Sequence, residues 1–111
     1  MSNKLKISII TVSFNSEDTI KNTIESVLSQ TYTNIEYIII DAASSDNTVS
    51  IIKSYADKIS YFISEQDQGI YYGMNKGLRV ANGDIVGILN SDDRYININV
   101  ISDVVRSFET N

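Results

Sequence analysis

Two adjacent carboxylates, Asp92 and Asp93, follow a short apolar run near the end of the chain. Neighbouring carboxylates repel each other, so such a pair is most simply stabilised by a cation. The chain has no histidine and no cysteine, and a metal site must therefore be built from oxygen ligands. Oxygen-only sites select a hard ion, Mg²⁺ or Mn²⁺, which keeps positions open for substrate phosphates. An ion that bridges a diphosphate acts as a Lewis acid and makes the nucleotide a better leaving group.

The composition excludes several other kinds of chemistry. Without cysteine the chain forms no disulfides and no thiolate, and without histidine it has no Ser-His triad. The formal net charge is -5 and the basic residues are scattered, which argues against a nucleic-acid surface. No apolar run approaches the ~20 residues of a transmembrane helix, and the N-terminus lacks a signal-peptide core. We therefore expect a cytoplasmic protein, and peripheral association with the inner face of the membrane stays open.

The elements that must position these residues are strands and helices in alternation. Four apolar, β-branched runs predict strands, namely Ile7–Val12, Ile35–Ile40, Ile59–Ile63 and Ile85–Leu89. Apolar residues at helical spacing predict four helices, with stripes formed by Ile20, Ile24, Val27 and Leu28, by Val49, Ile52 and Ala56, by Tyr71, Met74, Leu78 and Ala81, and by Ile101, Val104, Val105 and Phe108. This alternation is typical of βαβ units with a parallel sheet. We predict one α/β domain over residues 1–111, with right-handed crossovers and the strand order 3-2-1-4.

Polar residues collect where the predicted strands end. Acidic residues follow three of the four strands, namely Asp41, Asp67, and the pair Asp92 and Asp93. A single aspartate in such a place is often a turn former or a helix N-cap, and for Asp46 we prefer that interpretation. In an open parallel sheet, however, ligands bind beyond the carboxyl ends of the strands. We therefore expect Asp41, Asp67 and Asp92 to line one cleft.

Three long segments of the chain resemble the family 2 glycosyltransferases. The matching segments are ISIITVSFNSEDTIKNTIESVLSQTY (Ile7–Tyr32), IEYIIIDAASSDNT (Ile35–Thr48) and SEQDQGIYYGMNKGLRVANGDIVGILNSDD (Ser64–Asp93). The third segment is most similar to the branch that acts in bacterial exopolysaccharide and colanic-acid-type assembly. NSDD alone is common, but several motifs in the right order, each at a strand end, make the resemblance specific. The resemblance implies a GT-A fold with a Rossmann-like nucleotide-binding half, a nucleotide-diphosphate-sugar donor and a divalent ion.

The resemblance also assigns nucleotide contacts to individual residues. Thr11, Ser13 and Asn15 lie where the first strand-end loop of the family meets the nucleotide. Asp41 matches the acidic residue that holds the base or the ribose, and Asp67 matches a polar residue near the uracil or the ribose. The resemblance therefore implies that the nucleoside lies beyond the first three strands.

The metal and phosphate contacts follow from the last two matching motifs. Asn90, Ser91 and Asp92 occupy the position of the DxD motif of the family, with Asp92 as the direct metal ligand and Asn90 as a second one. Asp93 is placed close to the sugar or behind the metal ligands. Lys76, in the segment that matches the NxG motif, could meet a phosphate, although an exposed lysine is an equally good interpretation.

Two departures from the family pattern affect this site. The family commonly has DDGSxD where this chain has Asp41-Ala42-Ala43-Ser44-Ser45-Asp46, so one acidic contact is missing at Ala42. Asn90 replaces the first aspartate of DxD, and its carbonyl oxygen ligates weakly and brings no charge. Donor identity and metal affinity are therefore left open by the sequence.

No general base is found in the chain. In the family this base is a carboxylate of the C-terminal half, and it deprotonates the acceptor hydroxyl during inverting transfer. After Asp93, the acidic residues Asp103 and Glu109 lie on a helix that is predicted to be on the surface. We therefore expect the chain to be the truncated N-terminal half of a longer enzyme, with no catalytic residue of its own and no transfer activity.

The expected partners are a nucleotide-diphosphate sugar, first of all a UDP-sugar, and a glycan or lipid-linked acceptor in bacterial surface polysaccharide synthesis. Truncation would also expose an apolar surface, which leaves a homo-oligomer open. One alternative is a non-catalytic nucleotide-sugar-binding fragment of the same family. A remote alternative is a receiver-like, Mg²⁺-binding signalling domain, but that design needs an acidic pair near the end of its first strand, where this chain has Ser13, Phe14 and Asn15.

Overall fold

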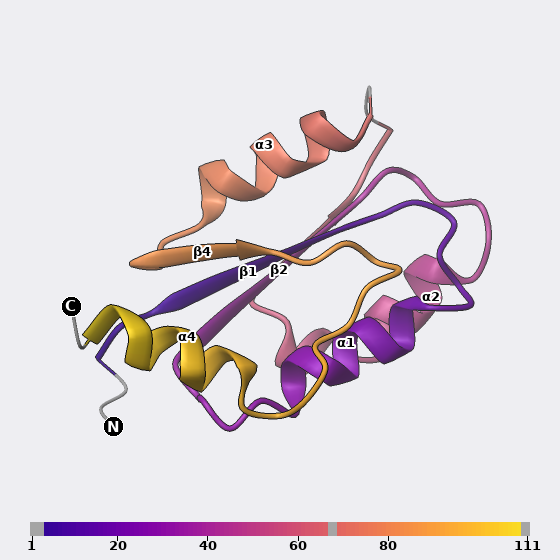
Figure 1. Cartoon of the computed structure of the whole chain (residues 1–111). Helices are drawn as coiled ribbons and strands as arrows, with labels where there is room; N and C mark the ends of the chain where they lie inside the picture. Colours follow the sequence, from indigo (N-terminus) through magenta and orange to yellow (C-terminus); the bar gives the residue numbers. More distant parts are fainter. Residues whose placement is uncertain (1–3, 67–68, 110–111) are drawn as a thin grey trace.

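The four predicted strands form one parallel sheet in a computed structural model that describes residues 4–66 and 69–109 (Figure 1). The strands are β1 (Ile7–Ser13), β2 (Ile35–Asp41), β3 (Tyr61–Ser64) and β4 (Ile85–Ile88). They pair in the order β3-β2-β1-β4, and all three pairings are parallel. The predicted fold class and strand order are therefore confirmed.

The register of the sheet brings the strand ends together. Ser13 at the end of β1 is the partner of Asp41 at the end of β2, and Asp41 is also the partner of Ser64 in β3. β1 is buried along its whole length, as expected for an isoleucine-rich strand that is covered on both faces. β3 begins at Tyr61, two residues later than predicted, because a 3₁₀ turn, η1 (Ala56–Lys58), precedes it. The polar loops after the strands therefore start from one edge of the sheet.

Helices cover both faces of the sheet. Figure 1 shows α1 (Ile20–Leu28), α2 (Thr48–Lys53) and α4 (Val100–Glu109) on one side and α3 (Ile70–Val80) on the other. The larger apolar core lies on the first side, and a smaller core that includes Ile10 and Ile38 lies under α3. Within the described part of the chain, no helix has both the length and the apolar character needed to cross a bilayer.

The first two helices differ in how closely they follow the predicted stripes. In α1 the predicted stripe is confirmed, because Ile20, Ile24 and Val27 are buried. α2 is shorter than predicted, and Ala56 lies exposed in η1 instead of on the α2 stripe. The Ser54 hydroxyl donates a hydrogen bond to the Ile51 carbonyl, a local bond that competes with continuation of the helix.

The face of α3 that packs on the sheet differs from the predicted one. Tyr71 and Leu78 of the predicted stripe are 77% and 48% exposed, and only Met74 and Ala81 pack against the core. Among the residues of α3 whose burial is described, the buried ones are instead Gly73 and Gly77. Glycine carries no hydrophobic signal in the sequence, yet the missing side chain lets the helix approach the sheet closely. The apolar spacing in the sequence therefore predicted Tyr71 and Leu78 as core residues of α3, although the buried glycines lie beside them.

We expect Gly77→Ala to lower the free energy of unfolding by ~1–3 kcal/mol, as overpacked cores do. A Cβ at this position would lie 2.5 Å from Cγ2 of Ile10. That methyl group stands on a β-branched carbon in a packed core, so it has little room to move. Urea denaturation followed by circular dichroism measures the change. Asn75→Ala, exposed on the same helix, is the control, and equal stability of the two variants would contradict the close packing.

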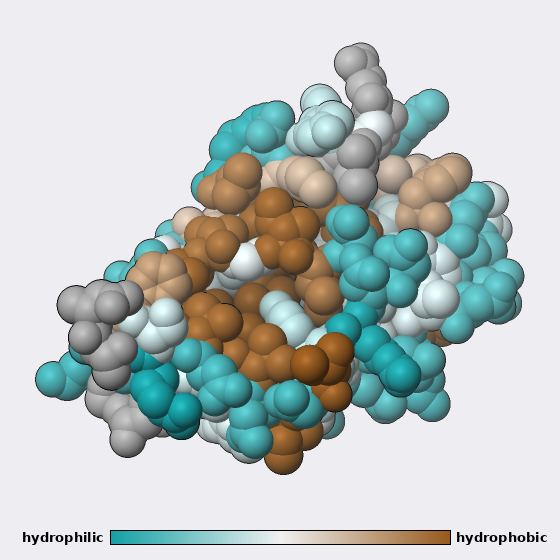
Figure 2. Space-filling view, viewed as in Figure 1, coloured by the Kyte–Doolittle hydropathy of each residue, from teal (hydrophilic) through white to brown (hydrophobic). Residues whose placement is uncertain are grey.

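A hydrophobic face is exposed over the edge strand β4. Among the described strands β4 pairs only with β1, and Figure 2 shows apolar residues gathered over β4 between α3 and α4. The exposed apolar side chains of these elements are Leu78, Val86, Ile88, Val104 and Phe108. The predicted α4 stripe is therefore only half correct. Ile101 and Val105 pack in the core, whereas the other two residues of the stripe are exposed. We call this surface the β4 face.

Candidate functional site

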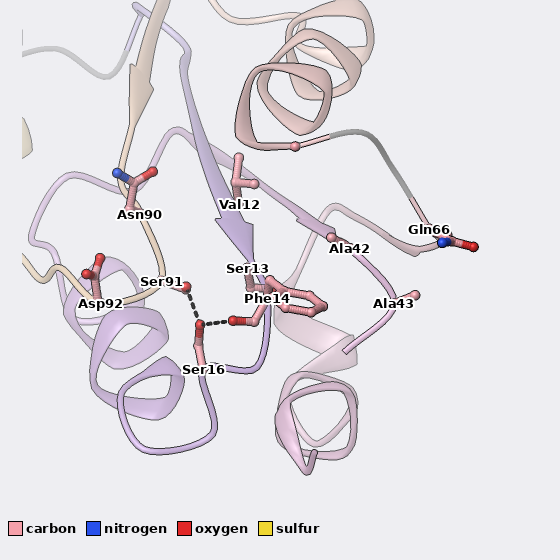
Figure 3. A pocket seen from close by; sticks show the side chains of 11 residues that line it. Val12, Ser13, Phe14, Ser16, Ala42, Ala43, Gln66, Asn90, Ser91 and Asp92 are labelled. Atoms are coloured by element: carbon pink, nitrogen blue, oxygen red, sulfur yellow. Dashed lines mark hydrogen bonds between the residues drawn. The ribbon is translucent and has the colours of Figure 1, made fainter. Parts of the chain in front are cut away.

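A pocket of about 850 Å³ opens at the carboxyl edge of the sheet (Figure 3). Four separate segments line it, with the residues Val12, Ser13, Phe14 and Ser16, Ala42 and Ala43, Gln66 and Gly69, and Asn90, Ser91 and Asp92. The crossovers of a parallel sheet bring such segments together where the strand order reverses, which is the usual ligand position in open α/β sheets. A cleft is therefore present at this edge, but of the aspartates that were expected to line it, only Asp92 does so among the described residues.

The loop after β1 places an aromatic ring in the pocket. Phe14 is 60% exposed and lies between the Asn90–Asp92 turn and the Ala42–Ala43 wall (Figure 3). Asn15 follows it with φ of 47°, a left-handed conformation that asparagine adopts more readily than most residues. An exposed phenylalanine in a polar loop is the clearest site residue that the sequence analysis did not single out, and its place at a strand end was the available signal.

Asn15 connects the first two strand-end loops instead of lining the pocket. Its backbone N–H donates to Oγ of Ser44 at 2.8 Å, and its side-chain Oδ1 accepts from the N–H of Ser45 at 2.8 Å. The side-chain oxygen of Asn15 is thus engaged within the protein. Its contribution to the site is to hold the loop after β1 against the loop after β2.

Asp41 is fully buried behind the pocket wall. Its Oδ1 accepts hydrogen bonds from the hydroxyls of Ser13 and Ser44, both at 2.6 Å. Its Oδ2 accepts from the Ser44 N–H and from the Ser64 hydroxyl, both at 2.8 Å. Asp41 does not line the pocket, and the next residue of the same loop, Ala42, lines it instead. The structure therefore does not place Asp41 in the cleft with Asp92, contrary to the expectation from the strand ends.

Thr11 also lies in the core. It is fully buried, and its hydroxyl forms a hydrogen bond of 2.8 Å with the hydroxyl of Tyr37. Burial raises the pKa of the Tyr37 hydroxyl well above its ordinary value, so Tyr37 stays neutral. Thr11 does not line the pocket, which the last two residues of β1, Val12 and Ser13, reach instead.

The remaining predicted nucleotide contacts, Lys76 and Asp67, belong to the third matching segment of the sequence, Ser64–Asp93. Lys76 pairs with Glu65 and lies 4.6 Å from the centroid of the Tyr72 ring, and it does not line the pocket. The Lys76 side chain is only 13% exposed, so it is not the exposed lysine of the alternative interpretation. Asp67 lies outside the described residues, and the neighbouring Gln66 lines the pocket.

Asp46 has the turn-forming role, one of the two that the sequence predicted for it, whereas the N-cap of α2 is Asn47. One of its carboxylate oxygens accepts from the backbone N–H of Thr48, the first residue of α2, and from the Thr48 hydroxyl, and the other accepts from the Glu17 N–H. Slight desolvation raises the pKa of the Asp46 carboxyl, but these hydrogen bonds outweigh it and leave the pKa below its ordinary value. Asp46 is thus a structural residue of the loop before α2.

The turn at residues 90–93 is fixed from β1 and α1. The Asp93 N–H donates to the Asn90 carbonyl at 2.9 Å, which closes the turn. Thr19 and Thr23 of the α1 region reach the Ser91 carbonyl with their hydroxyls at 2.8 and 2.9 Å. These contacts hold the peptide units of the turn, so the side chains of Asn90 and Asp92 remain directed to the pocket that they line.

The oxygen atoms of this turn fit a Mg²⁺ or Mn²⁺ ion. Oδ1 of Asn90 is buried and has no hydrogen-bond partner among the described residues, and Asp92 is an exposed carboxylate in the same pocket. Within residues 4–66 and 69–109, no three acidic groups come together as a complete metal cage. Mg²⁺-type sites are usually built from one or two protein oxygens together with substrate phosphates, which matches this donor set. Asp93 is exposed and does not line the pocket.

The sheet order, the pocket at its carboxyl edge and the acidic turn define an α/β protein with a pocket where open parallel sheets usually bind their ligands. The chain belongs to glycosyltransferase family 2, because the family described as Glycosyl transferase family 2 matches residues 8–111. This membership sets aside the receiver-like alternative.

Relatives and solved structures agree with this family. The chain is 39% identical over 105 residues to the UDP-Glc:alpha-D-GlcNAc-diphosphoundecaprenol beta-1,3-glucosyltransferase WfaP of Escherichia coli, with 94% of this chain and 41% of WfaP covered. It matches S. aureus TarS 1-349 in complex with UDP-GlcNAc with a TM-score of 0.87 and 27% identity, covering 96% of this chain and 32% of TarS. It also matches glucosyl-3-phosphoglycerate synthase of Mycobacterium tuberculosis, solved with Mn²⁺, UDP and glucosyl-3-phosphoglycerate, with a TM-score of 0.65 and 27% identity over 79% of this chain and 34% of that chain. The fold is therefore that of the GT-A glycosyltransferases, and the chain spans about two fifths of the length of the curated relatives it matches.

Proposed function

We propose that this chain is the donor-binding part of an inverting glycosyltransferase of bacterial surface polysaccharide synthesis. It binds a nucleotide-diphosphate sugar, first of all a UDP-sugar, in the pocket at the carboxyl edge of the sheet. The observation that carries the proposal is the pairing of an exposed aromatic ring, Phe14, with the oxygen-bearing turn at Asn90–Asp92 across one pocket. A nucleotide sugar has the two matching ends, a flat base and a charged diphosphate.

The nucleoside end of the donor fits the first two segments of the pocket. The Phe14 ring offers a flat apolar surface on which a base stacks. Ala42 and Ala43 form the adjacent wall and bring no charge and little volume. Ser13 and Gln66 supply polar groups beside this space. Because Asp41 is buried, base selection falls to backbone groups and to these neutral side chains.

The diphosphate end fits the turn after β4. Asp92 and Asn90 would hold the divalent ion, with Asp92 as the charged ligand. When bound, the ion supplies Lewis-acid chemistry by neutralising the charge that develops on the leaving diphosphate. The Mn²⁺ and UDP in the solved glucosyl-3-phosphoglycerate synthase support this pairing of a metal with a nucleotide. The role of this chain is to position the donor and the ion.

The test of this proposal is the effect of Phe14→Ala on UDP binding, measured by isothermal titration calorimetry with Mn²⁺ present. Base–aromatic stacking is worth ~1–3 kcal/mol, so we expect UDP to bind about tenfold more weakly. Phe108→Ala is the matched control, because Phe108 is 56% exposed against 60% for Phe14 but lies on α4. Equal UDP affinities of the two variants would contradict the placement of the base.

The acceptor site and the general base belong to the remainder of the full-length enzyme in this proposal. Asp92 is the one carboxylate among the described residues that line the pocket, and it is committed to the ion. The printed name of WfaP gives a UDP-sugar donor and a diphosphoundecaprenol acceptor. We take this relative as support for a lipid-linked or glycan acceptor, and for a cytoplasmic enzyme at the inner face of the membrane.

The β4 face gives a further expectation, that the isolated chain self-associates. Large exposed apolar surfaces on small domains favour association, and this face adds the unpaired outer edge of β4. We expect Ile88→Lys to shift the chain towards monomer in sedimentation velocity runs over a concentration series. The matched control is Tyr61→Lys, since Tyr61 is 40% exposed against 44% for Ile88 but lies on β3 at the opposite edge of the sheet. A chain that is monomeric at all concentrations would refute this expectation.

A further inference from the structure

The hydrogen bonds of Asp41 extend from one buried carboxylate to both walls of the pocket. Ser13 precedes Phe14 and donates to Oδ1 of Asp41 at 2.6 Å. Ser44 donates to the same carboxylate with its hydroxyl at 2.6 Å and its N–H at 2.8 Å. Each wall of the pocket is thus next to a residue that is hydrogen-bonded to Asp41. Phe14 follows Ser13, and the Ala42–Ala43 wall precedes Ser44.

The Ser44 hydroxyl continues this connection across the two loops. It donates its hydrogen to Asp41 and accepts the N–H of Asn15 at 2.8 Å. Asn15 then accepts the Ser45 N–H with its side-chain oxygen at 2.8 Å. Phe14 therefore stands between two residues, Ser13 and Asn15, whose positions depend on this network. We call the set formed by Asp41, Ser13, Ser44 and Asn15 the strand-end clamp.

The loops that the clamp holds include two unfavourable backbone conformations. Asn15 and Ala43 have φ of 47° and 57°. For residues with a side chain, the left-handed region costs ~1–2 kcal/mol, so such conformations persist only where surrounding contacts fix them. Ala43 lines the pocket, and the clamp supplies the contacts next to it.

We infer that Asp41 is a positioning residue of the donor pocket, which acts through Ser44 and Asn15 to fix Phe14 and the Ala42–Ala43 wall without touching the nucleotide. The inference rests on the proposed function. It differs from a direct contact to base or ribose, because both carboxylate oxygens of Asp41 are already occupied by four hydrogen bonds and the residue is fully buried.

Two serine substitutions separate positioning from a general loss of hydrogen bonds to Asp41. Ser44→Ala removes a hydroxyl that bonds Asp41 and also holds Asn15, whereas Ser64→Ala removes a hydroxyl that bonds Asp41 from β3 alone. Neither side chain lines the pocket. We expect Ser44→Ala to weaken UDP binding about five- to tenfold in the presence of Mn²⁺, and Ser64→Ala less than about twofold. Equal effects of the two variants would overturn the inference.

Asp41→Asn tests whether the carboxylate itself touches the nucleotide. Its amide oxygen can accept the Ser44 N–H, and the serine hydroxyls can rotate to accept from its amide group, so the clamp is retained. We expect UDP affinity within about threefold of the unmodified chain, whereas losing a direct hydrogen bond to a charged group costs ~10-fold or more. A tenfold loss in Asp41→Asn with an ordered loop would overturn the inference. Loop order is read from hydrogen exchange of the Ser44 and Ser45 amides.

The same exchange measurement distinguishes failure of the clamp from failure of the proposed function. If the unmodified chain does not bind UDP, the proposed function is wrong, but the clamp is still tested without ligand. Faster exchange of the Ser45 amide in Ser44→Ala than in Ser64→Ala supports the clamp. Equal exchange in the two variants overturns it.

Discussion

Asp92→Ala is expected to abolish Mn²⁺-dependent nucleotide binding while the fold stays intact. Asp92 is an exposed carboxylate in the pocket, and removing it leaves Asn90 as the only protein oxygen that we assign to the ion. Mutation of a residue that only hydrogen-bonds a metal ligand typically lowers metal affinity ~10–100-fold. Loss of the charged ligand itself should therefore lower the affinity by at least that much. Calorimetric titration of UDP with and without Mn²⁺ measures the effect, and circular dichroism verifies the fold.

Asp93→Ala is the control for this prediction. Asp93 is the adjacent aspartate, equally acidic and also exposed, but it does not line the pocket. Its removal should therefore weaken binding much less than removal of Asp92. If Asp92→Ala gives the same Mn²⁺ titration as the unmodified chain, the ion is held elsewhere and the assignment is wrong.

The 111-residue chain on its own is expected to bind a nucleoside diphosphate yet to transfer no sugar. Inverting transfer needs a base beside the acceptor hydroxyl, and loss of a general base costs ~10²–10⁴-fold. The described residues that line the pocket include no second carboxylate for that role. Without an acceptor site the positioning contribution, which can be larger still, is lost as well.

The assay for this second prediction follows a labelled UDP-sugar with mixed glycan and lipid-linked acceptors. The full-length product of the same coding region is the positive control, since the curated relatives are more than twice as long as this chain. Transfer by the longer protein but not by the chain is the expected result. Robust transfer by the chain alone would show that the base lies within it. No transfer by either, with donor binding intact, would favour the non-catalytic alternative.

Much of the fold could be predicted because its signals are hydrophobic and local. The isoleucine-rich runs identified all four strands, and the handedness of βαβ crossovers then gave the sheet order. The prediction was only partly correct for α3, because Met74 packs against the core as expected, whereas the buried Gly73 and Gly77 carry no apolar signal. The predicted apolar stripe of α4 was half wrong, because helical spacing in the sequence does not show which apolar residues of a helix pack against the core.

The pocket lies at the sheet edge where the sequence placed the site, but its lining differs in part from the predicted side chains. Strand ends are visible in the sequence, and Asp92 with Asn90 lines the pocket as expected. Thr11 and Asp41 are fully buried and do not line the pocket, and the sequence does not show which residues near a strand end the rest of the fold covers. The burial of Asp41 also depends on Ser44 and Ser64, which the sequence does not mark as its partners. Hydrogen bonds between residues that lie far apart in the chain leave no regular pattern in the sequence, so they could not be predicted from it.

A nucleoside diphosphate is expected to bind in the pocket at the carboxyl edge of the sheet. The direct measurement is a titration of UDP and Mg²⁺ into the ¹⁵N-labelled chain, followed by amide chemical shifts. We predict saturable shifts at Phe14, Ala42, Ala43, Ser91 and Asp92, with the amides of α4 unchanged. No saturable shift, or shifts that map to α4 or to the β4 face instead, would contradict it.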